Sequence, residues 1–101
     1  MEEIRYKRQI QLNEVGETGQ KKIKNSRVLV VGSGGLGCPI LMYLTGAGIG
    51  KIGIMDPDIV TLSNLQRQIL FTEKDIGKNK AISAKKHLQK MNSKIKIKAF
   101  P

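Results

Sequence analysis

The sequence predicts an α/β protein with a Rossmann-like parallel sheet, arranged β-α-β-α-β and preceded by two short helices. An apolar run over 28–31 leads into a cluster of four glycines. They are Gly32, Gly34, Gly35 and Gly37. A second apolar run ends at Asp56, 19 residues after Gly37, and residues 94–100 alternate lysine with apolar side chains. Strand, glycine turn, helix, strand and acid, in that order, are typical of a nucleotide-binding βαβ unit.

Residues 1–26 are expected to form a helical arm. Residues 2–10 predict one short basic helix, because Ile4 and Arg8 are spaced four apart. A second helix is expected over 17–24, closed by the polar residues that follow it.

Residues 27–101 are expected to form the nucleotide-binding unit. Its predicted elements are strands at 27–31, 51–56 and 94–100 and helices at 35–47 and 78–91. Because strands and helices alternate, the strands should be parallel. The predicted apolar stripes of the two helices are Leu36, Ile40, Leu44 and Ala47, then Ala81, Ala84, Leu88 and Met91.

One lysine of the second predicted helix differs from its neighbours. Lys80 lies only about 20° from Met91 on a helical wheel, so it should face the sheet and the glycine turn. Lys85, Lys86 and Lys90 should point to water. The long connection 57–79 is also expected to be functional, with Ser63 and Asn64 capping a short helical turn that ends at Arg67 or Gln68.

The glycines and the acid suggest how a nucleotide would be held. Gly32 allows a sharp turn, and Gly34 and Gly35 allow a phosphate to approach the backbone. Gly37 allows the helix to pack closely on the strands, and the N–H groups at the helix start face an anion. Asp56 stands where this fingerprint places a carboxylate that accepts from ribose hydroxyls.

Composition excludes several classes of protein. A single cysteine rules out an intramolecular disulfide and a multi-thiolate metal site. No apolar run approaches the roughly 20 residues of a membrane helix, and the charged N-terminus resembles no signal peptide. A cytoplasmic protein is therefore expected. The net charge of +10 is spread along the chain, so solvated faces are favoured over nucleic-acid binding.

Several motifs together go beyond a generic nucleotide site. They are Arg5-Tyr6-x-Arg8-Gln9, Gly32-x-Gly34-Gly35-Leu36-Gly37-Cys38-Pro39, Gly46-x-Gly48-x-Gly50, Asp56-x-Asp58, Ser63-Asn64-Leu65-Gln66-Arg67-Gln68 and Gly77-x-x-Lys80. In this order and spacing, the chain resembles the ThiF/MoeB/HesA family, the bacterial relatives of ubiquitin-activating enzymes. The Ser63–Arg67 block resembles the branch that activates sulfur carriers.

The resemblance implies ATP-dependent adenylation of the C-terminal glycine of a ubiquitin-like sulfur-carrier protein, in thiamine or molybdenum-cofactor biosynthesis. The nucleotide-binding residues it implies are Gly32, Gly34, Gly35, Asp56, Asp58, Ser63, Asn64, Arg67 and Lys80. The catalytic cations it implies are Arg67, Lys80 and Arg8, the last reaching the other subunit of a homodimer. The family's Mg²⁺-binding aspartate, zinc cysteines, catalytic cysteine and carrier-docking surface have no counterpart here. The chain is therefore expected to be an N-terminal portion without turnover of its own.

Two other functions stay open at this point. A nicotinamide-dependent oxidoreductase shares the glycine turn and the acid, but has no need of the Ser63–Arg67 block. A nucleic-acid-binding module would explain the charge and predicts a steep salt dependence.

Individual residues also have structural alternatives. Asp56 would cap a turn, Lys80 would be solvated, Arg67 would pair with Asp58 or Glu73, and Arg8 would be an ordinary basic helix residue. Cys38 and His87 are expected to have structural rather than chemical roles.

Overall fold

The computed structural model describes residues 2–34 and 37–101. It is an α/β fold around one parallel three-stranded sheet, which confirms the predicted class. The strands are β1 (Arg27–Val31), β2 (Lys51–Met55) and β3 (Lys96–Phe100), with β2 in the middle. Their registers align Val31, Met55 and Phe100 at one edge. The glycine turn after β1 and Asp56 after β2 therefore leave the sheet side by side.

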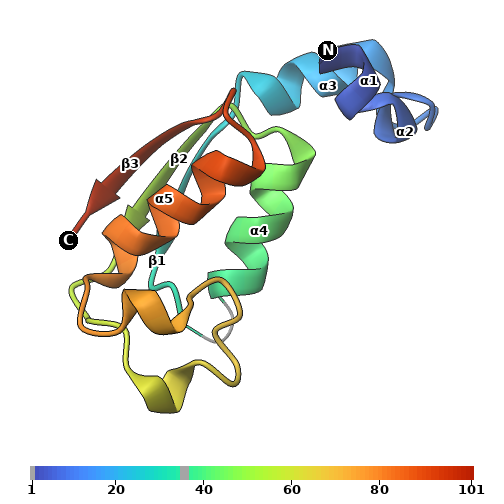
Figure 1. Cartoon of the computed structure of the whole chain (residues 1–101). Helices are drawn as coiled ribbons and strands as arrows, with labels where there is room; N and C mark the ends of the chain where they lie inside the picture. Colours follow the sequence, from blue (N-terminus) through green and yellow to red (C-terminus); the bar gives the residue numbers. More distant parts are fainter. Residues whose placement is uncertain (1, 35–36) are drawn as a thin grey trace.

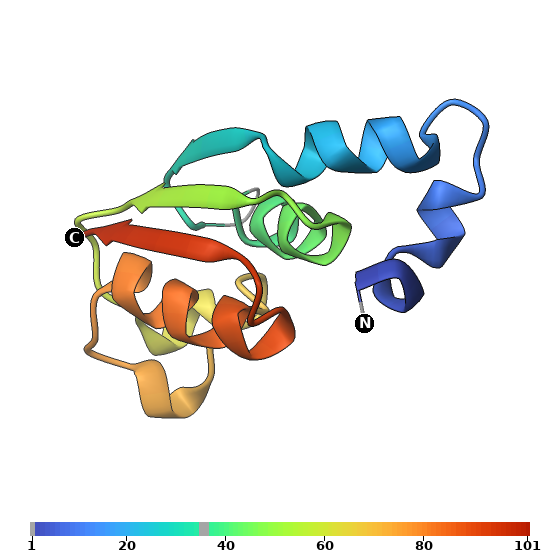
Figure 2. The same ribbon diagram turned by 90° about the horizontal axis from the view of Figure 1, so that it is seen from above.

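Two helices cover one face of the sheet (Figures 1 and 2). They are α4 (Gly37–Ala47) and α5 (Lys80–Met91). The strand residues that face them are apolar, and Ile52, Ile54 and Ile97 are almost completely buried. The rest of the core comes mainly from the two helices and the loop before α5: Cys38, Leu41, Val60, Leu70, Phe71, Ala81, Ala84 and Leu88.

The other face of the sheet is open among the described residues. Strand alternation directs Leu29, Val31, Met55 and Phe100 to it, and all four are substantially exposed. In Figure 2, α4 and α5 lie on the opposite side, and the helices of the arm extend beyond the end of the strands.

The predicted buried face of α4 is wrong in part. Ile40 is 49% exposed, whereas Leu41 and Thr45 are completely buried and Leu44 is partly buried. Leu36 lies outside the described residues. A largely apolar helix gives a weak periodic signal, so packing against β1 and α5 decided which side is buried.

The buried face of α5 follows the prediction except at its end. Ala81, Ala84 and Leu88 are fully buried, but Met91 is 41% exposed. The helix begins two residues later than predicted, with Asn79 as its N-cap. Met91 belongs to the last turn, where the chain is already leaving the sheet.

The arm has three helices instead of two: α1 (Glu2–Arg5), α2 (Lys7–Ile10) and α3 (Gly16–Lys24). The predicted helix 2–10 is interrupted at Tyr6, whose backbone is not helical. The ring of Tyr6 is buried, and its hydroxyl accepts a hydrogen bond from Asn92 Nδ2 at 2.7 Å. This tertiary contact holds the arm against the end of α5 and explains the break.

The segment 57–79 folds back on itself. It contains two 3₁₀ turns, η1 (Leu62–Asn64) and η2 (Glu73–Asp75). Its two ends are joined by main-chain hydrogen bonds, from Val60 N–H to the Lys78 carbonyl and from Gly77 N–H to the Val60 carbonyl, both 2.9 Å. The loop is thus closed at its neck, and the neck lies at the carboxyl edge of the sheet.

Candidate nucleotide site

The glycine turn and Asp56 are joined directly. The Asp56 side chain, 4% exposed, accepts from the Ser33 N–H at 2.8 Å and from the Ser33 hydroxyl at 3.0 Å, both at Oδ2. Its Oδ1 accepts from the Asp58 N–H at 2.9 Å. Asp56 therefore caps the following turn, as the structural alternative supposed, and also holds the glycine turn.

These hydrogen bonds keep Asp56 ionised. Burial raises the pKa of the Asp56 carboxyl, but the N–H groups of Ser33 and Asp58 stabilise its charged form more strongly, with help from the Ser33 hydroxyl and the positive charge of Lys80. The pKa of Asp56 is held below its ordinary value. The site therefore offers a fixed negative charge beside the glycine turn.

Gly37 allows the helix to start close to the turn. A Cβ on Gly37 would lie 2.1 Å from the carbonyl oxygen of Gly32, so a larger residue would displace the turn. This is the close helix packing expected of that glycine. Gly35 lies outside the described residues.

Lys80 is buried, as its position on the helical wheel predicted. Its side chain is 7% exposed, and its charge acts on both Asp56 and Cys38. Lys85, Lys86 and Lys90 are more open to solvent. Lys80 is therefore near enough to Asp56 for their charges to interact, and its burial excludes the solvated alternative.

The segment 63–68 reaches the glycine turn through Gln68. The Gln68 side chain is 3% exposed, and its Nε2 lies 3.7 Å from where a Cβ of Gly34 would stand. Its Oε1 is buried with no hydrogen-bond partner among the described residues. A buried amide oxygen without a donor is costly, which marks this place as one where a ligand or water completes the bonding.

The expected capping by Ser63 and Asn64 side chains is wrong. It is the main-chain carbonyl of Asn64 that accepts, from the N–H groups of Arg67 and Gln68, at 3.2 and 2.9 Å. The Asn64 side chain accepts from the Thr61 hydroxyl at 2.6 Å. The Asn64 side chain is therefore bonded to the residue before η1 and does not cap the turn that follows.

The Arg67 side chain is exposed. In the described part of the chain no ion pair joins it to Asp58 or Glu73, against the structural alternative. Ser63 and Asp58 are also exposed, and the Asp58 main chain binds Asp56 and α5.

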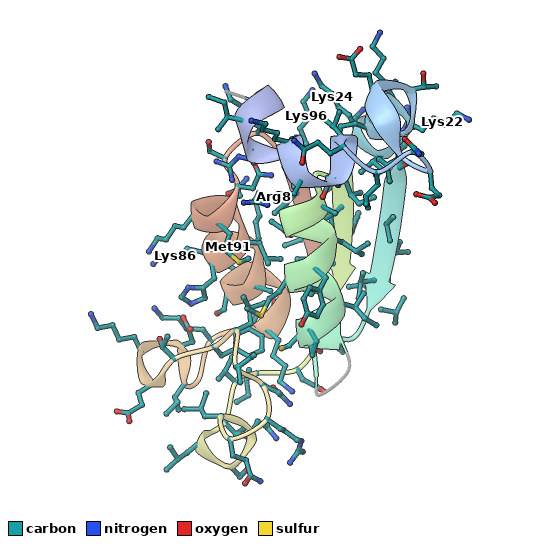
Figure 3. The ribbon with its side chains drawn as sticks, turned by 90° about the vertical axis from the view of Figure 1, so that its right-hand side faces the viewer. Arg8, Lys22, Lys24, Lys86, Met91 and Lys96 are labelled. Carbon is teal, nitrogen blue, oxygen red and sulfur yellow. The ribbon has the colours of Figure 1, made fainter. Side chains whose placement is uncertain are left out.

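Arg8 is not brought to the glycine turn. It lies on α2 at the same end of the molecule as Met91 (Figure 3), where Arg5 donates to the Met91 carbonyl at 3.1 Å. That is the amino edge of the sheet, whereas the glycine turn is at the carboxyl edge. Any contact between Arg8 and this kind of site must therefore involve another copy of the chain.

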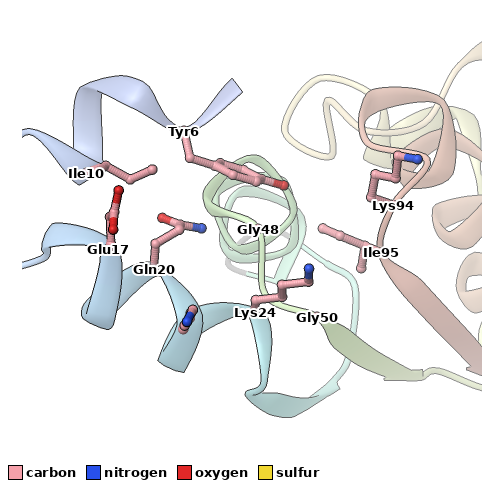
Figure 4. A pocket seen from close by; sticks show the side chains of 10 residues that line it. Tyr6, Ile10, Glu17, Gln20, Lys24, Gly48, Gly50, Lys94 and Ile95 are labelled. Carbon is pink, nitrogen blue, oxygen red and sulfur yellow. The ribbon is translucent and has the colours of Figure 1, made fainter. Parts of the chain in front are cut away.

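A cleft also lies between the arm and the sheet, away from the glycine turn (Figure 4). Tyr6, Ile10 and Ile95 supply its apolar walls, and Glu17 and Gln20 line it from α3. This cleft contains none of the predicted nucleotide-binding residues. The candidate site is therefore identified by the residues around the glycine turn and not by the presence of a cleft.

Cys38 and His87 make contacts typical of structural residues. The Cys38 thiol is fully buried and donates to the Ser33 carbonyl at 2.9 Å, and burial raises its pKa, as suits a core thiol. His87 Nε2 lies 2.6 Å from Asp75 Oδ2. No local sequence pattern predicts that Asp75 and His87 are paired, because they belong to η2 and α5.

Ser33, Gln68 and Asn79 are the site residues that sequence reasoning missed. Ser33 is the variable residue of the glycine motif, and Gln68 is the last residue of the Ser63–Gln68 motif. Their polar side chains within these motifs were the available signal. Asn79 gave a local signal as a helix cap, but its bonds to the end of β2 depend on the tertiary fold.

Residues 6–101 match the model of the ThiF family. The chain is 57% identical over 93 residues to the adenylyltransferase and sulfurtransferase MOCS3 of Aedes aegypti, covering 92% of this chain and 21% of that protein. It is 47% identical over 97 residues to the sulfur carrier protein adenylyltransferase of Thermus thermophilus, covering 96% and 36%.

Solved structures agree. The crystal structure of E. coli MccB with ATP superposes with a TM-score of 0.85 at 38% identity, covering 95% of this chain and 30% of that one. The chain thus spans about a fifth to a third of the length of these relatives. Since the family match runs from Tyr6 to the last residue and the fold agrees with it, this chain belongs to the ThiF family.

Proposed function

We propose that this chain carries the nucleotide site of an adenylyltransferase that uses ATP to activate the C-terminal glycine of a ubiquitin-like sulfur-carrier protein. The observation that carries the proposal is that Asp56 binds Ser33 of the glycine turn while the buried Lys80 is close enough for its charge to act on the same carboxylate. Support comes from a relative named as a sulfur carrier protein adenylyltransferase and from a similar structure that contains ATP.

In this proposal the site binds both the phosphates and the ribose of ATP. The glycine turn holds the phosphates: Gly32 makes the sharp turn, with its own N–H donated to the Met55 carbonyl at 2.8 Å, and Gly34 and Gly35 allow phosphate to approach the main chain. Asp56 accepts from the ribose hydroxyls, and the Asp58 N–H keeps its carboxylate oriented. Lys80, Asn64, Arg67 and Ser63 gather near the triphosphate.

The chemistry is a displacement at the α-phosphorus. A carboxylate oxygen of the carrier's terminal glycine forms a bond to that phosphorus, and the bond to the bridging oxygen of pyrophosphate breaks. The products are an acyl-adenylate and pyrophosphate. An anion must approach a polyanion, so Lys80 and Arg67 neutralise phosphate charge where it builds up. Arg8 of a second copy would add a further cation, which implies a homodimer.

ATP is proposed to act together with Mg²⁺, as the resemblance to the family implies. The described residues contain no group of three His, Cys, Asp or Glu side chains able to hold a metal ion.

The described residues include no helix long and apolar enough to cross a membrane. We place the protein in the cytoplasm, where its one buried cysteine stays reduced.

Calorimetric titration of the chain with ATP, adenosine and NAD tests the proposal. ATP should bind more tightly than NAD. Lys80→Met should weaken ATP binding roughly tenfold to a hundredfold, because a hydrogen bond to a charged group contributes about 1.5–3 kcal/mol. Adenosine binding should be unchanged, since it has no phosphate.

Lys86→Met is the matched control, because Lys86 is an exposed lysine on the same helix. A preference for NAD, or an equal loss of ATP affinity in both variants, would refute the proposal. Binding of duplex DNA that weakens steeply with salt would favour the nucleic-acid alternative.

A further inference from the structure

We propose that Asn79 is a positioning residue of this site: its side chain fastens the start of α5 to the end of β2 and so keeps Lys80 beside Asp56. The catalytic importance of this role rests on the proposed function. The link between α5 and β2 is shown by the hydrogen bonds of Asn79 itself.

The two ends of the Asn79 amide bind two different elements. Nδ2 donates to the main-chain carbonyl of Asp56 at 2.8 Å and, more weakly, to that of Asp58 at 3.4 Å. Oδ1 accepts from the N–H of Ile82 at 3.0 Å and so caps α5. A side chain with both a donor and an acceptor is needed to make this bridge.

The hydrogen bonds of Asn79 connect the two charged residues of the site, Asp56 and Lys80. The strand end of this bridge is the backbone of Asp56, and its helix end directly precedes Lys80. The Lys80 N–H adds a bond to the Asp58 carbonyl at 2.9 Å, so the first turn of α5 is held to the loop after β2. The hydrogen bond of Asn79 Nδ2 joins the start of α5 to residue 56 itself.

Small movements of α5 would move the charge of Lys80 appreciably. Side-chain atoms lie about 5–6 Å from a helix axis, so a rotation of about 10° shifts them by roughly 1 Å. Misplacement by about 1 Å costs catalytic sites on the order of a hundredfold in rate. A link at the first turn controls that rotation at the end of the helix where Lys80 lies.

The test compares Asn79→Ser with two other variants. Serine is as good an N-cap as asparagine, so α5 keeps its cap, but its hydroxyl is too short to reach the Asp56 carbonyl as well. Asn79→Thr provides a second such variant should serine fold poorly. Thr72→Ala is the control, because it removes the capping box of η2, away from Asp56.

The first measurement needs no nucleotide. The pKa of Asp56 is followed by ¹³C NMR in the wild type, Asn79→Ser, Lys80→Met and the double variant. We expect each single substitution to raise the pKa of Asp56, because the positive charge is displaced or removed. In the Lys80→Met background, Asn79→Ser should raise it no further. Thr72→Ala should leave it unchanged.

The second measurement is the ratio of ATP to adenosine affinity. Asn79→Ser should lower this ratio roughly tenfold or more, while Thr72→Ala lowers the melting temperature but not the ratio. A loss of stability alone would affect both ligands equally.

Two results would overturn the inference. One is an unchanged pKa of Asp56 in both cap-preserving variants. The other is an equal rise in the presence and absence of Lys80, which would mean that Asn79 acts on Asp56 by another route. If the wild type binds no ATP but the NMR cycle behaves as expected, the proposed function fails and the positioning role stands.

Discussion

The carboxylate of Asp56 accepts two hydrogen bonds from one residue, Ser33: the N–H at 2.8 Å and the hydroxyl at 3.0 Å, both on Oδ2. An oxygen of a carboxylate has two lone pairs, so Oδ2 is fully used. The acid that follows β2 thereby fixes the turn that follows β1. A ribose hydroxyl that binds Oδ2 would have to replace the Ser33 hydroxyl.

Ser33→Ala should expose this competition. Loss of one hydrogen bond should lower the free energy of unfolding by about 0.5–1.5 kcal/mol. Oδ2 would then be free for ribose, so the preference for ATP over 2′,3′-dideoxy-ATP should rise about two- to tenfold. Chemical denaturation and calorimetry measure the two effects. Ser26→Ala serves as the control, because that hydroxyl bonds the Lys22 carbonyl far from the turn. A reduced preference would show that Ser33 helps ribose binding instead.

The Asp75–His87 pair predicts a pH dependence of stability. Asp75 is buried, which raises the pKa of its carboxyl, but the Thr72 N–H and His87 outweigh this and lower it below the ordinary value. A lowered folded-state pKa stabilises the fold above the unfolded pKa of about 3.9. This contribution is lost as the pH falls through the folded value. Asp75→Asn should therefore cost about 1–3 kcal/mol near neutral pH and progressively less in acid.

Urea denaturation from pH 7 down to pH 2 measures the difference between the wild type and this variant. Glu73→Gln is the control, since Glu73 is an exposed acid in the same 3₁₀ turn. A difference that stays constant down to pH 2 would contradict the assignment.

Gly46 and Gly48 should respond oppositely to alanine. A Cβ on Gly48 would lie 2.6 Å from Cζ of Tyr6, and its φ of +91° is unfavourable for alanine. Gly48→Ala should therefore cost more than about 1 kcal/mol and loosen the arm. Gly46 lies within α4 with no atom within 4 Å of its Cβ position, so Gly46→Ala should add about 0.5–1 kcal/mol. Thermal denaturation measures both, and limited proteolysis of the arm separates local loosening from global loss. Similar effects of the two substitutions would argue against the Tyr6 contact.

Local sequence patterns were enough to predict the parallel sheet and the residues at the carboxyl ends of its strands. Residues 27–31 and 51–55 were predicted as strands to within one residue, because apolar runs bounded by turn residues are a local signal. Parallel strands then place the residue after each strand at one edge. Lys80 was found the same way, from a helical wheel on a helix of mixed polarity.

Tertiary contacts decided the rest. The buried side of α4 was misjudged because an apolar helix has no clear polar face to orient it. The break at Tyr6 and the pairing of Asp75 with His87 come from contacts with α5 that no local window contains. The sequence by itself determined the three parallel strands and the two helices that cover them, since apolar runs and helical periodicity depend on neighbouring residues. Only the tertiary structure decided which polar atoms meet at the site, because Ser33, Gln68 and Asn79 find their partners across elements far apart in the chain.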